Sequence, residues 1–179
     1  MAYQTADDVA ASAWSADEAV TKLFAAHYRP LVRLAALLLH DVGTAEEVVQ
    51  DAYVAVHQRW GRLRDPEKAA AYLRQAVVNR ARSVLRRRGV ADRFLRRQPT
   101  LPTIPSAEAG ALAAETQTEV LAALRTLPTR QREALVLRYY ADLSEAQTAD
   151  TMGISRGAVK SHTARALAAL RVTMERGEQ

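Results

Sequence analysis

The sequence predicts an all-α protein with two small helical domains joined by a flexible linker. Apolar residues recur three and four positions apart over long stretches, as on the buried face of a helix, and no run alternates with the period of two typical of strands. Three prolines between residues 98 and 106 interrupt this pattern, because proline is not compatible with a helix interior. The chain has 179 residues, 49% of them hydrophobic, so each side of the interruption can bury a small core.

An acidic arm precedes the first domain. Residues 1–16 hold Asp7 and Asp8 but no lysine or arginine, so we expect an arm without a fixed structure. Residues 17–90 form the first domain, and its helical stretches are 20–39, 45–60 and 69–85. Thr44 is expected to cap the second of these helices, whose first turn is acidic.

The middle of the chain is strongly basic. From Arg59 to Arg97 there are 13 basic and three acidic residues, and residues 91–114 are expected to form a basic, proline-containing linker. Such a concentration of positive charge indicates a polyanionic partner, although a charge run taken alone is more often a solvated surface. The second domain is expected at 115–176.

The second domain contains a helix-turn-helix motif at 143–171. Ser144 is expected to cap a short helix that ends at Met152. Gly153 then supplies the turn, and Ser155 caps a longer second helix. This spacing predicts a helix that enters the major groove of DNA.

The outward face of that second helix is basic and short-chained. Val159 and Ala166 lie on its apolar face, whereas Ser161 and Arg165 face away from it and Lys160 lies on the flank. Small side chains let the backbone enter a groove about 12 Å wide, while lysine and arginine reach base edges and phosphates. An amphipathic helix with a solvated polar face is the alternative reading of the same pattern.

A second polar track lies on the helix predicted around Tyr72 to Arg88. Its members are four, three and four residues apart and lie opposite an apolar stripe that includes Leu73 and Val77. They are Gln75, Asn79, Arg82 and Arg86. We expect this track to contact a nucleic-acid backbone with salt-dependent affinity.

These motifs together resemble one family. Residues 127–140 (LPTRQREALVLRYY) and 153–161 (GISRGAVKS) are similar to region 4 of bacterial extracytoplasmic-function (ECF) RNA polymerase sigma factors of the actinobacterial type. Residues 45–53 (AEEVVQDAY) and 72–82 (YLRQAVVNRAR) are similar to region 2 of that family. The two regions occur in the family's order, with a linker between them.

The resemblance implies a promoter-specificity subunit that directs core RNA polymerase to minus-35 and minus-10 promoter elements and starts DNA melting. Region 4 would contact the polymerase flap, and region 2 the polymerase clamp. The residues implied for the minus-35 element are Arg156, Lys160, Ser161, His162 and Arg165. Those implied for the minus-10 element and melting are Trp60, Arg62, Asn79, Arg80, Arg82 and Arg86. Those implied for core polymerase binding are Gln50, Asp51 and Val54.

Some positions depart from the family pattern. Tyr72 stands where tryptophan is common, and His57 stands where an aromatic residue is common. Thr148 and Thr151 occupy positions that are usually isoleucine, valine or leucine. A buried hydroxyl needs a hydrogen-bond partner, so we expect the two threonines to loosen the packing of their helix.

Other classes of function lack the residues they require. The chain has no cysteine, its four histidines are scattered, and no phosphate-binding glycine loop is present. We therefore expect no metal, no cofactor and no catalytic residue. Together with the resemblance, this predicts an initiation factor and not an enzyme. No stretch approaches the roughly 18 apolar residues of a membrane span, and the N-terminus is unlike a signal peptide. The predicted location is the cytoplasm.

Two alternatives to the sigma-factor interpretation stay open. A conventional helix-turn-helix transcriptional regulator would bind an operator without polymerase, usually as a dimer on a palindrome. A helical adaptor for an acidic protein would explain the charge but not the helix-turn-helix spacing. An anti-sigma factor is a further partner that the resemblance allows.

Overall fold

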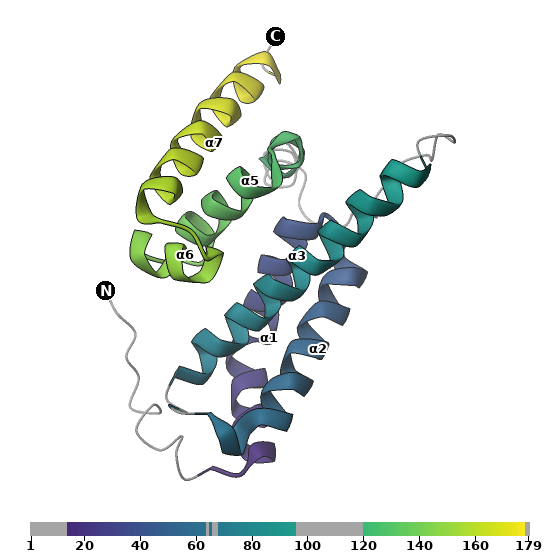
Figure 1. The fold of residues 1–179 in the computed structure, drawn as a ribbon, viewed down its shortest axis with the longest axis vertical. Helices are drawn as coiled ribbons and strands as arrows, with labels where there is room; N and C mark the ends of the chain where they lie inside the picture. The colour runs from purple at the N-terminus through teal and green to yellow at the C-terminus, as the bar shows by residue number, and fades with distance from the viewer. Residues whose placement is uncertain (1–13, 64, 66–67, 96–119, 178–179) are drawn as a thin grey trace, which may run out of the picture. The chain divides into compact units, whose positions relative to one another are not determined.

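The computed structural model describes residues 14–63, 65, 68–95 and 120–177. The chain divides into two compact units, Met1–Arg86 and Arg87–Gln179. Within the described ranges every regular element is helical and no strand occurs, which confirms the predicted all-α class (Figure 1). The proline-containing stretch at 98–106, expected to be extended, lies outside these ranges.

Helix α1 (Ala16–Leu39) begins at a capping box. The backbone N–H of Ser15 donates to the Glu18 carboxylate at 2.9 Å, and the N–H of Glu18 donates to Ser15 Oγ at 3.3 Å. The backbone N–H and then the hydroxyl of Ser15 lower the pKa of Glu18 below its usual value. The folded unit therefore starts earlier than the expected boundary at 17, and Trp14 and Ser15 do not belong to the arm.

Helix α2 (Val42–Arg59) is capped by Asp41, not by Thr44 as the sequence suggested. The Asp41 Oδ1 atom accepts a hydrogen bond from the backbone N–H of Thr44 at 3.0 Å. An aspartate in extended conformation just before a helix can reach this amide, which leaves Thr44 inside the first turn. A short 3₁₀ turn, η2 (Trp60–Arg62), follows the helix directly.

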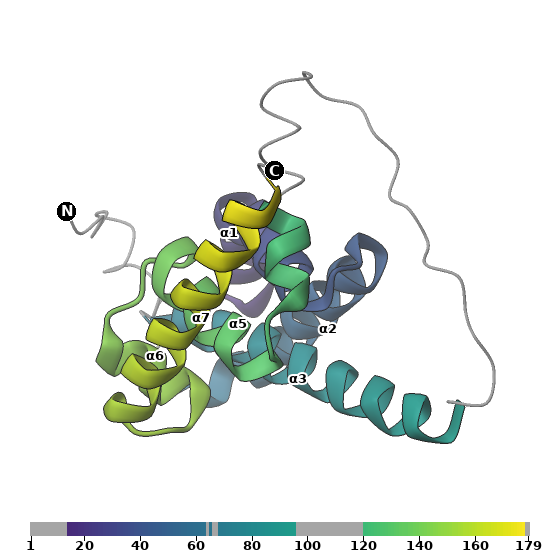
Figure 2. The same cartoon turned by 90° about the horizontal axis from the view of Figure 1, so that it is seen from above.

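Helices α1 and α2 pack against each other in the first unit (Figure 2). Tyr53 links them through a buried hydrogen bond, because its hydroxyl donates to the Leu23 carbonyl at 2.9 Å. The same burial raises the pKa of Tyr53. The apolar side chains buried on the two helices are Leu23, Leu31, Leu34, Leu38, Leu39, Val48, Val49 and Val56.

Helix α3 (Ala69–Leu95) carries the expected apolar stripe, with some changes. Leu73, Val77 and Ala81 are fully buried as predicted, and Val78 is fully buried as well. Val84, which the periodicity placed on the same stripe, is only half-buried. The helix continues to Leu95, so the prediction that the linker starts at residue 91 placed its start too early.

Beyond the end of α3, the second unit is described over helical residues 120–126, α5 (Thr129–Leu135), the π-helical turn η4 (Val136–Tyr140), α6 (Glu145–Met152) and α7 (Arg156–Gly177). Helix α7 packs against both α5 and α6. It extends beyond 171, where the helix-turn-helix was expected to end. The buried apolar side chains of these elements are Leu124, Leu127, Leu135, Val136, Leu137, Leu143, Met152 and Val159.

Arg130, paired with a buried carboxylate, connects α5 to the helix-turn-helix. Glu133 is 2% exposed, and Arg130 Nη1 lies 3.4 Å from Glu133 Oε2. The same Nη1 donates to the Met152 carbonyl at 3.4 Å. Because Met152 is the last residue of α6, the guanidinium also meets the negative end of that helix. One arginine thus connects the start of α5 to the turn before α7.

Thr148 is the residue of α6 whose packing most clearly departs from an ideal core. Its side chain is fully buried, and Thr148 Oγ1 has no hydrogen-bond partner in the structure. We expect Thr148→Val to stabilise the second unit by about 1–2 kcal/mol, because valine has the same shape without the unpaired hydroxyl. Urea unfolding followed by circular dichroism measures the change.

Thr151 provides the matched control, since it is also a buried threonine of α6 but has interactions of its own. Thr151→Val is therefore not expected to raise the midpoint. An unchanged or lower midpoint for Thr148→Val would show that its hydroxyl is satisfied in solution.

None of the helices in the described ranges is long and apolar enough to span a membrane.

Candidate nucleic-acid interface

The helix-turn-helix forms as the sequence predicts. Ser144 closes a capping box on α6, and Gly153 ends that helix in the left-handed conformation, with φ of 64°. Ser155 Oγ accepts a hydrogen bond from the backbone N–H of Ala158 at 3.2 Å, which caps α7. These three local signals determine where the second helix of the motif starts.

Helix α7 buries one face and leaves cationic side chains on the other. Val159 and Ala166 are fully buried, whereas Arg156, Lys160 and Arg165 are exposed. Lys160 Nζ lies 3.6 Å from Glu145 Oε2 of α6, and both side chains reach solvent. An exposed ion pair of this kind contributes less than about 1 kcal/mol, so Lys160 can readily exchange it for a phosphate or a base edge.

Two of the predicted minus-35 residues are less accessible than expected. Ser161 and His162 are half-buried, although the helical wheel placed Ser161 on the outward face. The His162 Nδ1 atom is buried and has no hydrogen-bond partner in the structure. The position of Ser161 is therefore corrected to the flank of α7, because neighbouring elements cover part of that face. Arg156, Lys160 and Arg165 form the exposed cationic set, which we call the α7 basic face.

On α3 the predicted polar track is a connected ladder of side chains. The Asn79 Oδ1 atom accepts hydrogen bonds from Gln75 Nε2 and from Arg82 Nη1, each at 3.3 Å. One turn later, Arg86 Nη2 donates to Ser83 Oγ at 3.2 Å. These bonds link side chains on successive turns of one side of the helix. We call this set, with the half-buried Arg80 beside it, the α3 track.

Trp60 corrects the predicted minus-10 set. Its side chain is buried, with 7% exposure, and its indole N–H donates to the Trp14 carbonyl at 3.0 Å. It is thus a core residue and not an exposed DNA contact, whereas Arg62 in the same turn is exposed. The loop that follows is only partly described, at residues 63, 65 and 68.

Trp14 was not among the predicted site residues. The pattern Trp14-Ser15-Ala16-Asp17-Glu18 nevertheless indicates that Trp14 packs on α1, because an apolar residue just before a capping box commonly packs against its helix. In the structure Trp14 is half-buried, and Lys22 Nζ lies 4.0 Å from the centre of its ring.

The three residues predicted to bind core polymerase share one face of α2. Gln50, Asp51 and Val54 are exposed, and they lie within one turn of each other opposite the buried residues Val49 and Val56. Val54 is 54% exposed, which is high for a valine in the middle of a helix. An apolar side chain flanked by polar ones is typical of the centre of a protein contact.

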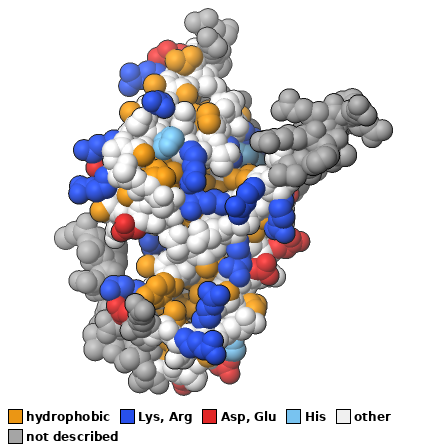
Figure 3. Space-filling model, viewed as in Figure 1, with side chains coloured by type: hydrophobic (Ala, Val, Ile, Leu, Met, Phe, Trp, Pro, Cys, Tyr) orange, Lys and Arg blue, Asp and Glu red, His pale blue; other side chains and the backbone are white. Residues whose placement is uncertain are grey.

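The charge of the surface suits a polyanion and the described residues do not suit a metal. Basic side chains dominate over acidic ones on the face shown in Figure 3. Among the residues with described placement, no group of three or more His, Cys, Asp or Glu side chains could hold a metal ion. The cationic side chains of these surfaces can make electrostatic and hydrogen-bonding contacts with a polyanion such as nucleic acid.

Family models match both units in order. The model for Sigma-70 region 2 matches residues 23–90, and the model for Sigma-70 region 4 matches residues 117–170. The first match covers α2 and the α3 track, and the second covers the helix-turn-helix.

Curated relatives and solved structures agree with these models. The chain is 33% identical over 145 residues to the RNA polymerase sigma-E factor of Streptomyces avermitilis, covering 81% of this chain and 79% of the relative. It is 36% identical over 155 residues to the ECF RNA polymerase sigma factor SigM of Mycobacterium tuberculosis, covering 85% and 75%. Its fold is similar to that of RpoE from Bartonella quintana, solved with the anti-sigma factor NepR, with a TM-score of 0.72, 23% identity and coverage of 87% and 96%. CnrH, solved with the cytosolic domain of CnrY, has a TM-score of 0.67, 25% identity and coverage of 96% and 98%.

Proposed function

Because the chain belongs to the extracytoplasmic-function family of RNA polymerase sigma factors, we propose a division of promoter recognition between its two units. The protein is a promoter-specificity subunit of RNA polymerase, and its partners are the core enzyme and promoter DNA. The observation that carries the division is the pair of cationic surfaces, the partly exposed α3 track and the exposed α7 basic face, in the two units that match regions 2 and 4.

The α7 basic face reads the minus-35 element. A recognition helix docks with its N-terminal part in the major groove, and Arg156, Lys160 and Arg165 lie in the first half of α7. Arginine and lysine are the side chains best suited to guanine edges and to phosphates. His162 and Ser161 contribute from the flank, where their partial burial limits them to close contacts.

The α3 track handles the minus-10 element and strand separation. Removing a base from the stack costs a few kcal/mol, which contacts to the separated strand can offset. The hydrogen-bonded ladder supports this role, because side chains already paired with one another lose less conformational freedom on binding. Arg62 and the loop after it precede α3 in the sequence, and we assign them to the same minus-10 contact. No step of the mechanism requires hydrolysis, so we propose that the protein catalyses no reaction by itself.

The exposed face at Gln50, Asp51 and Val54 binds the clamp of the core enzyme, and the second unit contacts the flap. Binding at several points means that neither DNA contact needs high affinity alone, because the first contact raises the local concentration of the next. An anti-sigma factor is a third partner in this proposal, in keeping with the complexes of the structural relatives. We place the protein in the cytoplasm, where it meets polymerase and promoter DNA.

Binding to purified core polymerase, followed by transcription from a promoter located by start-site mapping after overexpression, tests the proposal. Stoichiometric binding of one copy and promoter-dependent transcription are the expected results. A conventional helix-turn-helix regulator would instead bind an operator without polymerase, and the absence of a complex with the core enzyme would support that alternative.

A further inference from the structure

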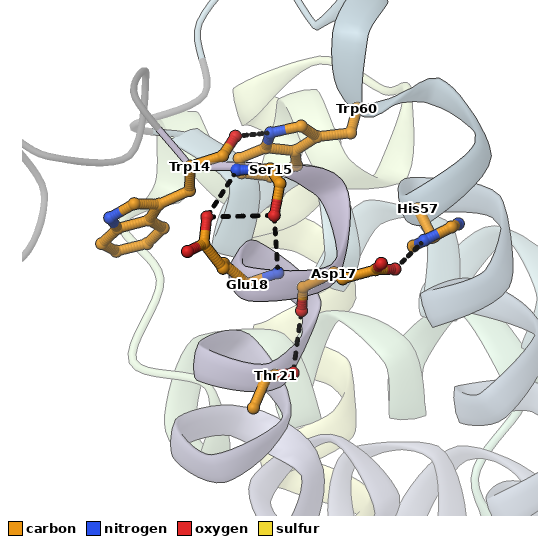
Figure 4. A network of polar contacts seen from close by, with 7 residues as sticks. All are labelled: Trp14, Ser15, Asp17, Glu18, Thr21, His57 and Trp60. Carbon is orange, nitrogen blue, oxygen red and sulfur yellow. Dashed lines mark hydrogen bonds and ion pairs between the residues drawn. The ribbon is translucent and has the colours of Figure 1, made fainter.

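The first turn of α1 is tied to the end of α2 by a group of polar contacts (Figure 4). The Trp60 indole N–H donates to the Trp14 carbonyl at 3.0 Å, and His57 Nε2 lies 2.7 Å from Asp17 Oδ1. Trp14 and Asp17 flank the start of α1, whereas His57 and Trp60 lie at the end of α2 and the start of η2. We call these two contacts the N-terminal clasp.

The Trp14 side of the clasp is held by contacts with its neighbours. Its ring is half-buried beneath Lys22, and the next residue, Ser15, is fixed by the capping box with Glu18. The Trp14 carbonyl is therefore held in place by contacts on both sides of it. The His57–Asp17 pair is more exposed, so the indole hydrogen bond is the stronger half of the clasp.

The Trp60 side of the clasp is the point where the chain leaves α2. Trp60 starts the turn η2 and its ring is buried. Arg62, two residues later in the same turn, is exposed. The Leu63 N–H donates back to the Trp60 carbonyl at 3.1 Å, which fixes the direction in which the chain continues. A change at Trp60 therefore acts directly on the turn that carries Arg62.

We propose that Trp14 is a positioning residue for promoter melting: through Trp60 it sets the orientation of the η2 turn and of Arg62, which is proposed to act at the minus-10 element. This inference rests on the function proposed for the first unit. Trp14 itself does not touch DNA in this proposal. It acts by keeping the η2 turn ordered before DNA binds, so that no conformational entropy of this turn is lost during melting.

The test compares two templates, using the full chain and core polymerase. One is an ordinary duplex promoter, and the other carries a pre-opened bubble at the minus-10 element. Trp14→Ala keeps the backbone carbonyl but removes the ring whose packing holds that carbonyl in place. It is expected to lower open-complex formation on the duplex by about three- to tenfold, the size of one weakened hydrogen bond, and to leave the bubble template unchanged. Trp60→Phe removes the N–H donor together with part of the buried ring and is expected to act in the same direction.

A double variant and a matched control separate positioning from general destabilisation. The Trp14→Ala and Trp60→Phe effects should not add, because the Trp14 ring acts through the hydrogen bond whose donor Trp60→Phe removes. Tyr53→Phe removes another hydrogen bond from an aromatic donor to an α1 carbonyl, so it lowers the stability of the same unit but should leave the duplex-to-bubble ratio at the wild-type value.

Three results would overturn the proposal: equal loss on both templates for Trp14→Ala, no loss on the duplex, or the same change of ratio for Tyr53→Phe. A failure of the proposed function itself looks different, since the wild-type protein would then direct no transcription from either template.

Discussion

Val54→Asp is expected to weaken binding to core polymerase by about 2–4 kcal/mol while leaving the first unit folded. Val54 is 54% exposed, so a carboxylate there remains solvated in the free protein. In the proposed contact with the clamp the same carboxylate would be buried at the centre of the interface without a partner, which has a cost of this size. Equilibrium binding of the labelled chain to core polymerase measures the loss.

Val42→Asp is the matched control for that experiment. Val42 is 58% exposed and begins the same helix, twelve residues and about 18 Å from Val54. The added charge is the same, and a carboxylate in the first turn suits the helix dipole. The two variants should therefore differ sharply in polymerase affinity. Equal affinities would remove the α2 face from the proposed interface, and a lower unfolding midpoint in Val54→Asp would assign its effect to folding instead.

Arg165→Ala and Lys160→Ala are each expected to weaken minus-35-dependent transcription by about 1–3 kcal/mol per base contact. Both side chains lie on the α7 basic face and are exposed, so the free protein should fold normally without them. The loss should depend on the minus-35 sequence, because a base contact discriminates between sequences and a phosphate contact does not. Transcription from promoters with altered minus-35 elements measures that dependence.

Arg171→Ala controls for the loss of a positive charge on the same helix. Arg171 is also exposed, but it lies six residues further along α7, away from the end that enters the groove. Its replacement should alter transcription little. Core polymerase binding should be unchanged in all three variants, and equal loss of that binding in Arg165→Ala and Lys160→Ala would show that the face has been misassigned.

The caps show how far local sequence determines structure here. Ser144, Gly153 and Ser155 were predicted correctly because each acts on backbone groups within a few residues. Thr44 was wrong for an equally local reason, since Asp41 and Thr44 are both suitable caps three residues apart. The choice between them depends on where α2 begins, which reflects its packing on α1.

Helical periodicity predicted the site residues only relative to their own helix. It placed Arg165 on the outward face of α7 and Lys160 on its flank, and both are exposed; it also placed the ladder around Asn79 on one side of α3. It did not reveal that Ser161 is partly covered or that Trp60 is buried. Whether a given face reaches solvent depends on what packs against it, and the helix's own pattern does not contain that information.

The all-α class, the capping of the helix-turn-helix and the family of the protein can be read from the sequence, because they follow from spacings within short segments. The role of Trp60 and its contact with Trp14 depend on the tertiary structure. Their hydrogen bond joins residues 46 positions apart, and no local pattern specifies which carbonyl a distant indole will meet. Such contacts form only after α1 and α2 have packed, when an indole N–H removed from water must find a new acceptor.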